Sequence, residues 1–74
     1  MTTIEVRPSK KFGGAWAAVE APGVQPAFVG SRAREYALSY ARGRFGGRSG
    51  AIHLYDPTGA VIEETIQIDR RERR

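Results

Sequence analysis

The sequence contains no cysteine and a single histidine, His53. A disulfide and a thiolate metal site are therefore impossible, and a zinc site built from several histidines is excluded as well. A chain without cysteine fits a reducing compartment. No apolar run approaches the roughly 20 residues that are needed to cross a bilayer, and the N-terminus lacks the apolar stretch and cleavage site of a signal peptide. We therefore expect a cytoplasmic protein.

The residue combinations on which most enzymes depend are missing too. No serine has a nucleophile motif around it, and no phosphate-binding loop or metal cluster is present. Glu63 and Glu64 are adjacent on a predicted strand, so they point to opposite faces and cannot act as a carboxylate pair. On its own predicted strand His53 has Ala51 and Tyr55 as same-face neighbours, and neither would orient a general base. We predict no enzymatic activity, cofactor, metal site, small-molecule substrate or membrane contact.

The 74 residues allow one domain, and their net charge of +4 is unevenly distributed. We expect a single small domain over residues 1–69 and a charged tail over residues 70–74, RRERR, which carries +3. Within the domain, residues 32–48 hold five arginines and one glutamate, whereas residues 49–69 hold four acids and no lysine or arginine. Such polarity can steer a polyanion, attract a second copy, or be a solvated surface.

Residues 31–47 are the one stretch whose periodicity predicts a helix. Ser31 is a suitable N-cap, and Gly46 or Gly47 can end the helix in a left-handed conformation. The apolar positions follow one side of a helix: Ala33, Tyr36, Ala37, Tyr40 and Ala41, widened by Leu38 and Phe45. Three alanines in this stripe would let the helix sit close to a sheet.

Two strands are predicted before the helix. Residues 3–8 alternate between apolar and charged side chains and end at a proline, and residues 15–20 follow after a glycine-bearing loop, as in a hairpin. Trp16 and Val19 are three apart and cannot share a face of a regular strand. Either a bulge reconciles them, or Val19 faces away from Trp16. Residues 27–29 either continue the second strand or pack over the helix start.

Two more strands are predicted after the helix, over residues 51–56 and 60–68. The sequence Asp56-Pro57-Thr58-Gly59 between them has the residues of a tight turn. Alternation in the last strand places three isoleucines on one face, interrupted by Glu64: Ile62, Ile66 and Ile68. The fold class is therefore α+β, in the order β-β-α-β-β. Because each strand pair is a hairpin, we predict a four-stranded antiparallel sheet with one helix on one face.

Several of these segments together resemble the small bacterial family called domain of unknown function 2188. The resemblance covers roughly residues 4–66. It is carried by the Val6–Pro8 strand end, the glycine-rich loop before Trp16, the alanine-rich helix with Glu35, Tyr40 and Ala41, the Gly46-Gly47 stop and the hairpin that ends at Gly59–Ile62.

This chain departs from the family at three places. The family usually places Trp and Val two apart, whereas here they are three apart. Members often carry a histidine where this chain has Tyr55, and His53 lies two residues earlier. The arginine-rich tail is not part of the family pattern. The resemblance implies the fold, and because the family has no assigned function it implies no functional residue.

Basic residues supply one set of candidate contacts. Residues 42–48, RGRFGGR, resemble an RGG-type nucleic-acid-binding segment, although a helix end would carry the same arginines and glycines. Residues 10–14 match part of an RNA-recognition signature, and a hairpin loop explains them as well. The possible nucleic-acid contacts are Lys10, Lys11, Arg42, Arg44, Arg48, Arg70, Arg71, Arg73 and Arg74.

The sheet face that the helix leaves uncovered supplies the other set. The possible interface residues are Trp16, Val19, His53, Tyr55 and Val61. We expect a small non-enzymatic interaction domain that forms a homodimer through this face or through a sheet edge. The alternative is low-specificity binding of nucleic acid or another polyanion through the basic helix end and the tail.

Overall fold

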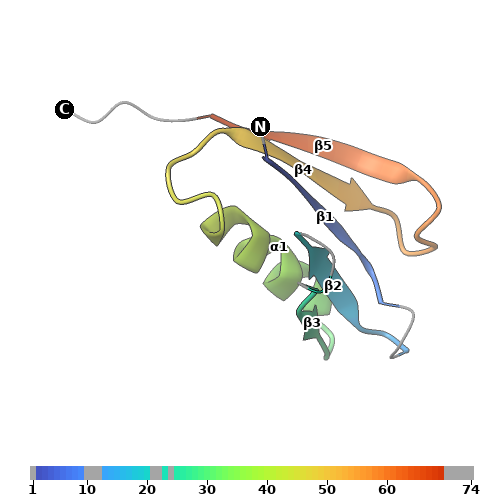
Figure 1. Cartoon of the computed structure of the whole chain (residues 1–74). Helices are drawn as coiled ribbons and strands as arrows, with labels where there is room; N and C mark the ends of the chain where they lie inside the picture. The colour runs from blue at the N-terminus through green and yellow to red at the C-terminus, as the bar shows by residue number, and fades with distance from the viewer. Residues whose placement is uncertain (1, 10–12, 21–22, 24, 70–74) are drawn as a thin grey trace.

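The computed structural model describes residues 2–9, 13–20, 23 and 25–69, and these form an α+β fold. Figure 1 shows one helix lying against one face of one sheet. The elements are β1 (Thr2–Pro8), β2 (Trp16–Val19), β3 (Ala27–Phe28), α1 (Ala33–Gly43), β4 (Gly50–Tyr55) and β5 (Ile62–Ile68). The sequence placed the helix and four of these strands correctly to within a few residues.

The sheet has five strands in the order β3-β2-β1-β4-β5, and it is mixed. β1 and β4 are parallel, whereas the other neighbouring pairs are antiparallel. The prediction of four strands, all antiparallel, is therefore wrong. Each hairpin is antiparallel within itself, but the sheet joins the first strand of one hairpin to the first strand of the other. α1 carries the chain back across the sheet, so β4 runs in the direction of β1, as in any crossover connection.

The fifth strand is β3, which the sequence left as an extension of β2 or as a segment over the helix. It pairs antiparallel with β2, with Trp16 opposite Phe28. The chain has reversed direction between these strands, and Gly23 lies in that reversal with a φ of 85°. Only glycine adopts such an angle without strain.

β2 is a regular strand without a bulge, so Trp16 and Val19 point to opposite faces of the sheet. Trp16 lies opposite Pro8 and Phe28 and packs against the core beneath the helix. Val19 lies opposite Glu5, on the other face. Of the two arrangements open to the sequence, the one without a bulge is confirmed.

α1 packs on the sheet through its alanines. Ala33, Ala37 and Ala41 are buried, as the spacing predicted, whereas Tyr36 is 51% exposed. The helix starts later than predicted: its N-cap is Arg32, which makes no side-chain capping hydrogen bond. Ser31 instead lies in the turn before it, where the Ala33 N–H donates to the Gly30 carbonyl over 3.2 Å.

The prediction that Gly46 or Gly47 caps the helix is wrong, because α1 ends at Gly43 and its C-cap, Arg44, is right-handed. The two glycines instead lie in the turn that follows, next to the largest fully buried side chain, Phe45. Gly46 and Gly47 have φ angles of 56° and 87°, and they turn the chain just after Phe45, which is 1% exposed. Burying an aromatic or branched side chain of this size stabilises the fold by about 1.5–3 kcal/mol. The core cluster consists of Ile4, Val6, Ala18, Ala37, Ala41, Phe45, Ile52 and Leu54.

The turn between β4 and β5 forms around Asp56, as predicted. Its Oδ1 accepts from the Thr58 and Gly59 N–H groups over 3.1 and 3.0 Å and from the Thr58 hydroxyl over 2.7 Å. Gly59 has a φ of 78°. This is the Asx arrangement that makes Asp favourable at the start of a turn.

β5 does not alternate as the sequence suggested, because the pairing with β4 shifts by one residue. Leu54 lies opposite Glu64 and Tyr55 opposite Ile62, so Glu63 is an extra residue in β5. Such a bulge moves what precedes it to the other face. Ile66 and Ile68 pack against the core, but Ile62 lies opposite Tyr55 and is 41% exposed. The prediction that the three isoleucines share a face is wrong.

Gly50, the first residue of β4, offers a test of this packing. A Cβ there would lie 2.3 Å from the Thr2 carbonyl oxygen and 2.4 Å from a Phe45 ring carbon. Because one of these atoms is backbone, Gly50→Ala should destabilise the fold by at least about 2 kcal/mol in urea denaturation. Gly43→Ala is the control, since a Cβ there meets nothing within 4 Å, and it should be neutral or stabilising by up to about 1 kcal/mol. Equal stabilities for the two variants would contradict the close approach.

Candidate interaction surfaces

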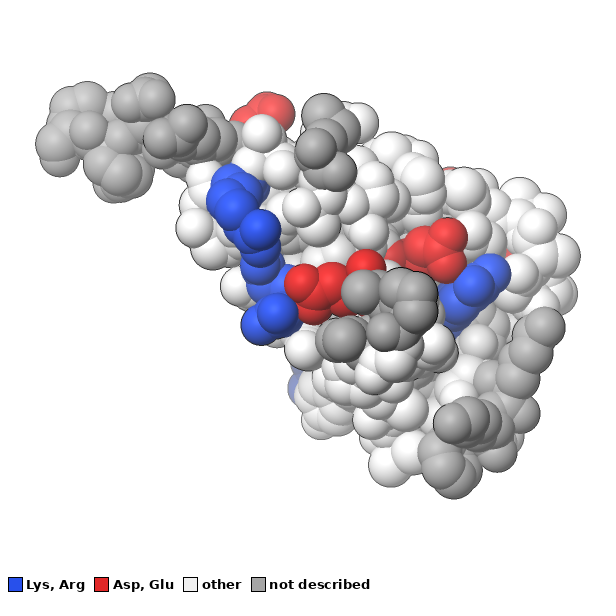
Figure 2. All heavy atoms as spheres, viewed as in Figure 1, with Lys and Arg blue, Asp and Glu red and all other residues white. Residues whose placement is uncertain are grey.

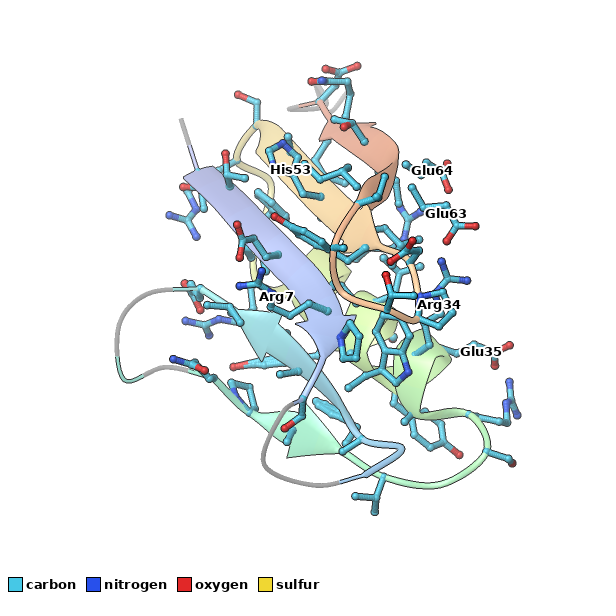
Figure 3. All side chains as sticks on the ribbon, turned by 90° about the vertical axis from the view of Figure 1, so that its right-hand side faces the viewer. Arg7, Arg34, Glu35, His53, Glu63 and Glu64 are labelled. Carbon is cyan, nitrogen blue, oxygen red and sulfur yellow. The ribbon has the colours of Figure 1, made fainter. Side chains whose placement is uncertain are left out.

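The sheet face turned away from α1, which we call the open face, is polar at its centre. The strand registers place these residues on it: Thr3, Glu5, Arg7, Ala17, Val19, Ala27, Ala51, His53, Tyr55, Ile62, Thr65 and Gln67. Charged and hydrogen-bonding side chains occupy β1 and β4, the central strands. Figure 3 shows Arg7 and His53 projecting from them.

Glu5, Arg7 and Tyr55 form a connected network at that centre. Arg7 Nη1 lies 3.0 Å from Glu5 Oε1, and the Arg7 guanidinium carbon lies 4.6 Å from the centroid of the Tyr55 ring. The Tyr55 hydroxyl donates to Glu5 Oε2 over 3.3 Å. Among the described residues of the open face, Tyr55 is the one aromatic ring, and Arg7 already stacks on it. A nucleic-acid base would have to displace that arginine to stack there.

His53 lies between Glu5 of β1 and Thr65 of β5. From the sequence alone, only Ala51 and Tyr55 were expected beside His53. Glu5 is its neighbour because β1 pairs parallel with β4, which was not predicted. The Glu5 carboxylate is bound by Arg7 and Tyr55, and in the described part of the chain the His53 side chain makes no hydrogen bond. Glu5 therefore contacts Arg7 and Tyr55, and the structure shows no hydrogen bond between it and His53.

The five predicted interface residues do not form one surface. Val19, His53 and Tyr55 lie on the open face. Trp16 lies on the opposite face, against the core. Val61 lies in the bend before β5 and is 58% exposed.

Arg34 joins three elements on the helix side of the sheet. Its Nη2 lies 2.5 Å from Glu63 Oε1 in β5, and its guanidinium carbon lies 5.3 Å from the Trp16 ring centroid in β2. Its Nε is buried without a hydrogen-bond partner. Figure 3 shows Arg34 beside Glu63. Arg34 thereby ties the start of β5 to the helix.

β5 forms one edge of the sheet, and β3 forms the other. Within the described ranges its inner side pairs with β4 and its outer side with nothing. α1 packs against β1 to β4, and β5 lies beyond β4, away from the helix (Figure 1). Ile66 and Ile68 are only half-buried there. Proline and lysine, which commonly protect edge strands, are absent from the seven residues of β5. The protecting features that β5 does have, the bulge at Glu63 and two glutamates, lie in its first half. We call this outer side the β5 edge, residues 62–68.

Two of the arginines predicted to contact nucleic acid have partners within the fold. Arg44 donates to both carboxylate oxygens of Glu20, over 2.9 and 3.3 Å. Arg48 donates to the carbonyls of Phe45 and Arg44, over 2.9 and 2.8 Å, and so holds the turn that follows the helix. Arg42 is exposed in the last helical turn and has no recorded partner among the described residues.

The remaining predicted basic contacts lie outside the described residues: Lys10, Lys11, Arg70, Arg71, Arg73 and Arg74. The described residues carry six arginines and seven carboxylates, which gives −1. The others carry six basic residues and one glutamate, which gives +5, and the two parts sum to the total of +4. On the face in Figure 2, basic and acidic side chains lie next to one another. The part of the chain that the structure describes therefore carries no excess of positive charge.

Comparison of the chain with family models, curated proteins and solved structures gives no match. In the described ranges, no three histidine, aspartate or glutamate side chains gather as a metal site would require. The same ranges contain no helix with the length and apolar character of a membrane span.

The pairing of Glu20 with Arg44 should be visible in the pH dependence of stability. The Arg44 hydrogen bonds hold the pKa of Glu20 below its ordinary value of 4.5. A lowered folded pKa contributes stability that is present above the unfolded pKa and is lost as pH falls through the folded pKa. From about pH 5 down to about pH 3, Glu20→Gln should therefore lose less thermal stability than the parent. The Thr58 hydroxyl lowers the pKa of Asp56 as well, and its effect on stability is the same in the parent and in Glu20→Gln. Identical losses would contradict the pairing.

Proposed function

We propose that this chain is a non-enzymatic interaction domain that associates with a second copy of itself through the β5 edge. The carrying observation is a seven-residue edge strand whose outer side has no described partner. Unpaired N–H and C=O groups along such an edge are a template for another strand. The resemblance to the domain of unknown function 2188 family names no function, so the proposal depends on this geometry.

The open face is the weaker candidate for the contact. Its centre holds the Glu5–Arg7 ion pair and the Tyr55 hydroxyl. Covering them with a partner would remove charged groups from water, which costs several kcal/mol per ion unless new partners compensate. Half of the apolar residues of that face are alanines, which offer little area to bury.

Two exposed threonines on the same face distinguish an edge contact from a face contact. Thr65 lies in β5, and Thr3 lies in the central strand β1. At several hundred micromolar, light scattering should give twice the chain mass for the parent and for Thr3→Glu, and a lower average mass for Thr65→Glu. The two substitutions change net charge equally. A monomeric mass for the parent would contradict the proposal. A lower average mass for Thr3→Glu alone would indicate a contact through the open face instead of the β5 edge.

Nucleic-acid binding is the second candidate function, favoured by the charge of +5 outside the described residues. If it occurs, a fluorescent single-stranded oligonucleotide should bind more weakly as salt rises. Replacing Arg70, Arg71, Arg73 and Arg74 by Gln should flatten that salt dependence much more than Arg42→Gln does. Binding that ignores salt would contradict an electrostatic contact.

A further inference from the structure

We infer that the ion pair between Arg34 and Glu63 holds the start of β5 in its bulged register, and that breaking the pair lets this strand pair regularly with β4. The change moves Ile62 from the open face to the helix side of the sheet. We call the three side chains that hold the bulge, Arg34, Glu63 and Trp16, the Arg34 latch (Figure 3). All of them lie in one chain, so the latch does not depend on the proposed self-association.

The residues of β5 suit a regular strand better than a bulged one. In the structure Leu54 lies opposite Glu64 and Tyr55 lies opposite Ile62, which leaves Glu63 as the extra residue. Without the bulge, Glu63 would lie opposite Tyr55, and all three isoleucines of β5 would share the helix side, as simple alternation predicts. The bulge instead leaves Ile62 on the open face, 41% exposed. Burial of an apolar side chain therefore favours the regular register.

Arg34 occupies the place that Ile62 would take in the regular strand. Trp16 lies opposite Pro8 on the helix side, and extending the parallel pairing of β1 with β4 by two residues sets Pro8 beside Asp56. In the regular register Ile62 would lie opposite Asp56, and it would thus join the row of Trp16 and Pro8. The Arg34 guanidinium carbon lies 5.3 Å from the centroid of the Trp16 ring in that row. Arg34 and Ile62 therefore compete for the surface of Trp16.

The latch is weak enough to be reversible. The side chains of Arg34 and Glu63 are 40% and 53% exposed, and ion pairs as exposed as this one contribute little to stability. Arg34 Nε is buried without a hydrogen-bond partner, which disfavours the latched state further. The regular register also offers Glu63 a cation, because its place opposite Tyr55 adjoins Arg7, which stacks on that ring. The two registers are therefore close in free energy, and the Arg34 contact decides between them.

The turn before β5 can accommodate both registers. In the structure the Asp56 N–H donates to the Val61 carbonyl over 3.0 Å, so residues 57–60 form the loop between them. Regular pairing of Asp56 with Ile62 would leave residues 57–61 in the loop. Hairpin loops of about four and about five residues are both common. The change of register therefore requires movement of the turn and of the start of β5, whereas β4 and α1 stay in place.

The register also sets how much of the β5 edge is regular. A bulge bends a strand and interrupts its row of N–H and C=O groups, which hinders pairing with a further strand. With the latch closed the regular part of the edge covers residues 64–68, and with the latch open it would cover residues 62–68. Opening the latch should therefore strengthen self-association. This consequence alone rests on the proposed function.

Thiol labelling tests the latch, because the chain has no cysteine of its own. Ile62→Cys should react with iodoacetamide at least about fivefold more slowly when it is combined with Arg34→Gln, since position 62 then leaves the open face and packs beside Trp16. Arg32→Gln is the matched control. It removes the same charge from the same helix end, but its partner is Glu35, and it should leave the labelling rate of Ile62→Cys within about twofold.

A second labelling position separates a change of register from a loosened strand. Val61 lies in the bend before β5, is 58% exposed, and belongs to the turn in both registers. Val61→Cys should therefore react at the same rate, within about twofold, with and without Arg34→Gln. Faster labelling of both positions in Arg34→Gln would mean that the strand has only come loose, and it would overturn the latch. An unchanged rate for Ile62→Cys would overturn it as well.

Glu63→Gln breaks the same ion pair from the other side and gives an independent reading by nuclear magnetic resonance. In the parent, cross-strand nuclear Overhauser effects should join Tyr55 to Ile62, which lie opposite one another. In Glu63→Gln they should join Tyr55 to position 63 instead. Effects between Tyr55 and Ile62 that persist unchanged in Glu63→Gln would contradict the latch.

Light scattering tests the consequence for the edge separately. Arg34→Gln should dimerise with a dissociation constant at least about threefold lower than that of Arg32→Gln, because more of its β5 edge is regular. Equal dissociation constants together with a changed register would overturn the effect on the edge and support the latch. A monomeric parent whose register changes in Arg34→Gln would contradict the proposed self-association and likewise support the latch.

Discussion

The close approach at Gly50 is the contact on which the arrangement of the sheet depends. There the chain returns from the helix, and the space for a side chain is filled by the Thr2 carbonyl and the Phe45 ring. This closeness lets β4 begin beside β1 and run parallel to it. Everything that lies across those two strands, including the Glu5–Arg7–Tyr55 network and the neighbours of His53, follows from that parallel pairing.

Local patterns predicted the elements well because their causes are local. The alanine spacing of α1, the turn residues around Asp56 and the glycines after Phe45 each act within a few residues. The mixed sheet could not be predicted in this way, since the β1–β4 pairing joins segments nearly fifty residues apart and no short pattern encodes it. The bulge at Glu63 is another example: regular alternation predicted one face for Ile62, Ile66 and Ile68, and one extra residue separated them.

The candidate site was predictable in part. Val19, His53 and Tyr55 were placed on the open face by simple alternation, and they lie there. Glu5 and Arg7 were predicted to lie in a strand. Their contact with Tyr55 depends on the parallel register of β1 and β4, which the sequence does not reveal. The roles of the arginines could not be predicted from the sequence either. A count of charges cannot tell that Arg44 is bound to Glu20 or that Arg48 donates to carbonyls just after the helix. The described residues carry −1, whereas the whole chain carries +4.

The two edges of the sheet differ greatly in length, and this difference limits the size of any assembly. β5 offers seven residues, whereas β3, at the opposite edge, has only two. If the long edges of two copies pair with each other, the edges that remain are both short. Two paired residues give too few hydrogen bonds to recruit another strand. Pairing through β5 would therefore leave only the two-residue β3 edges, which are poor templates for a further strand.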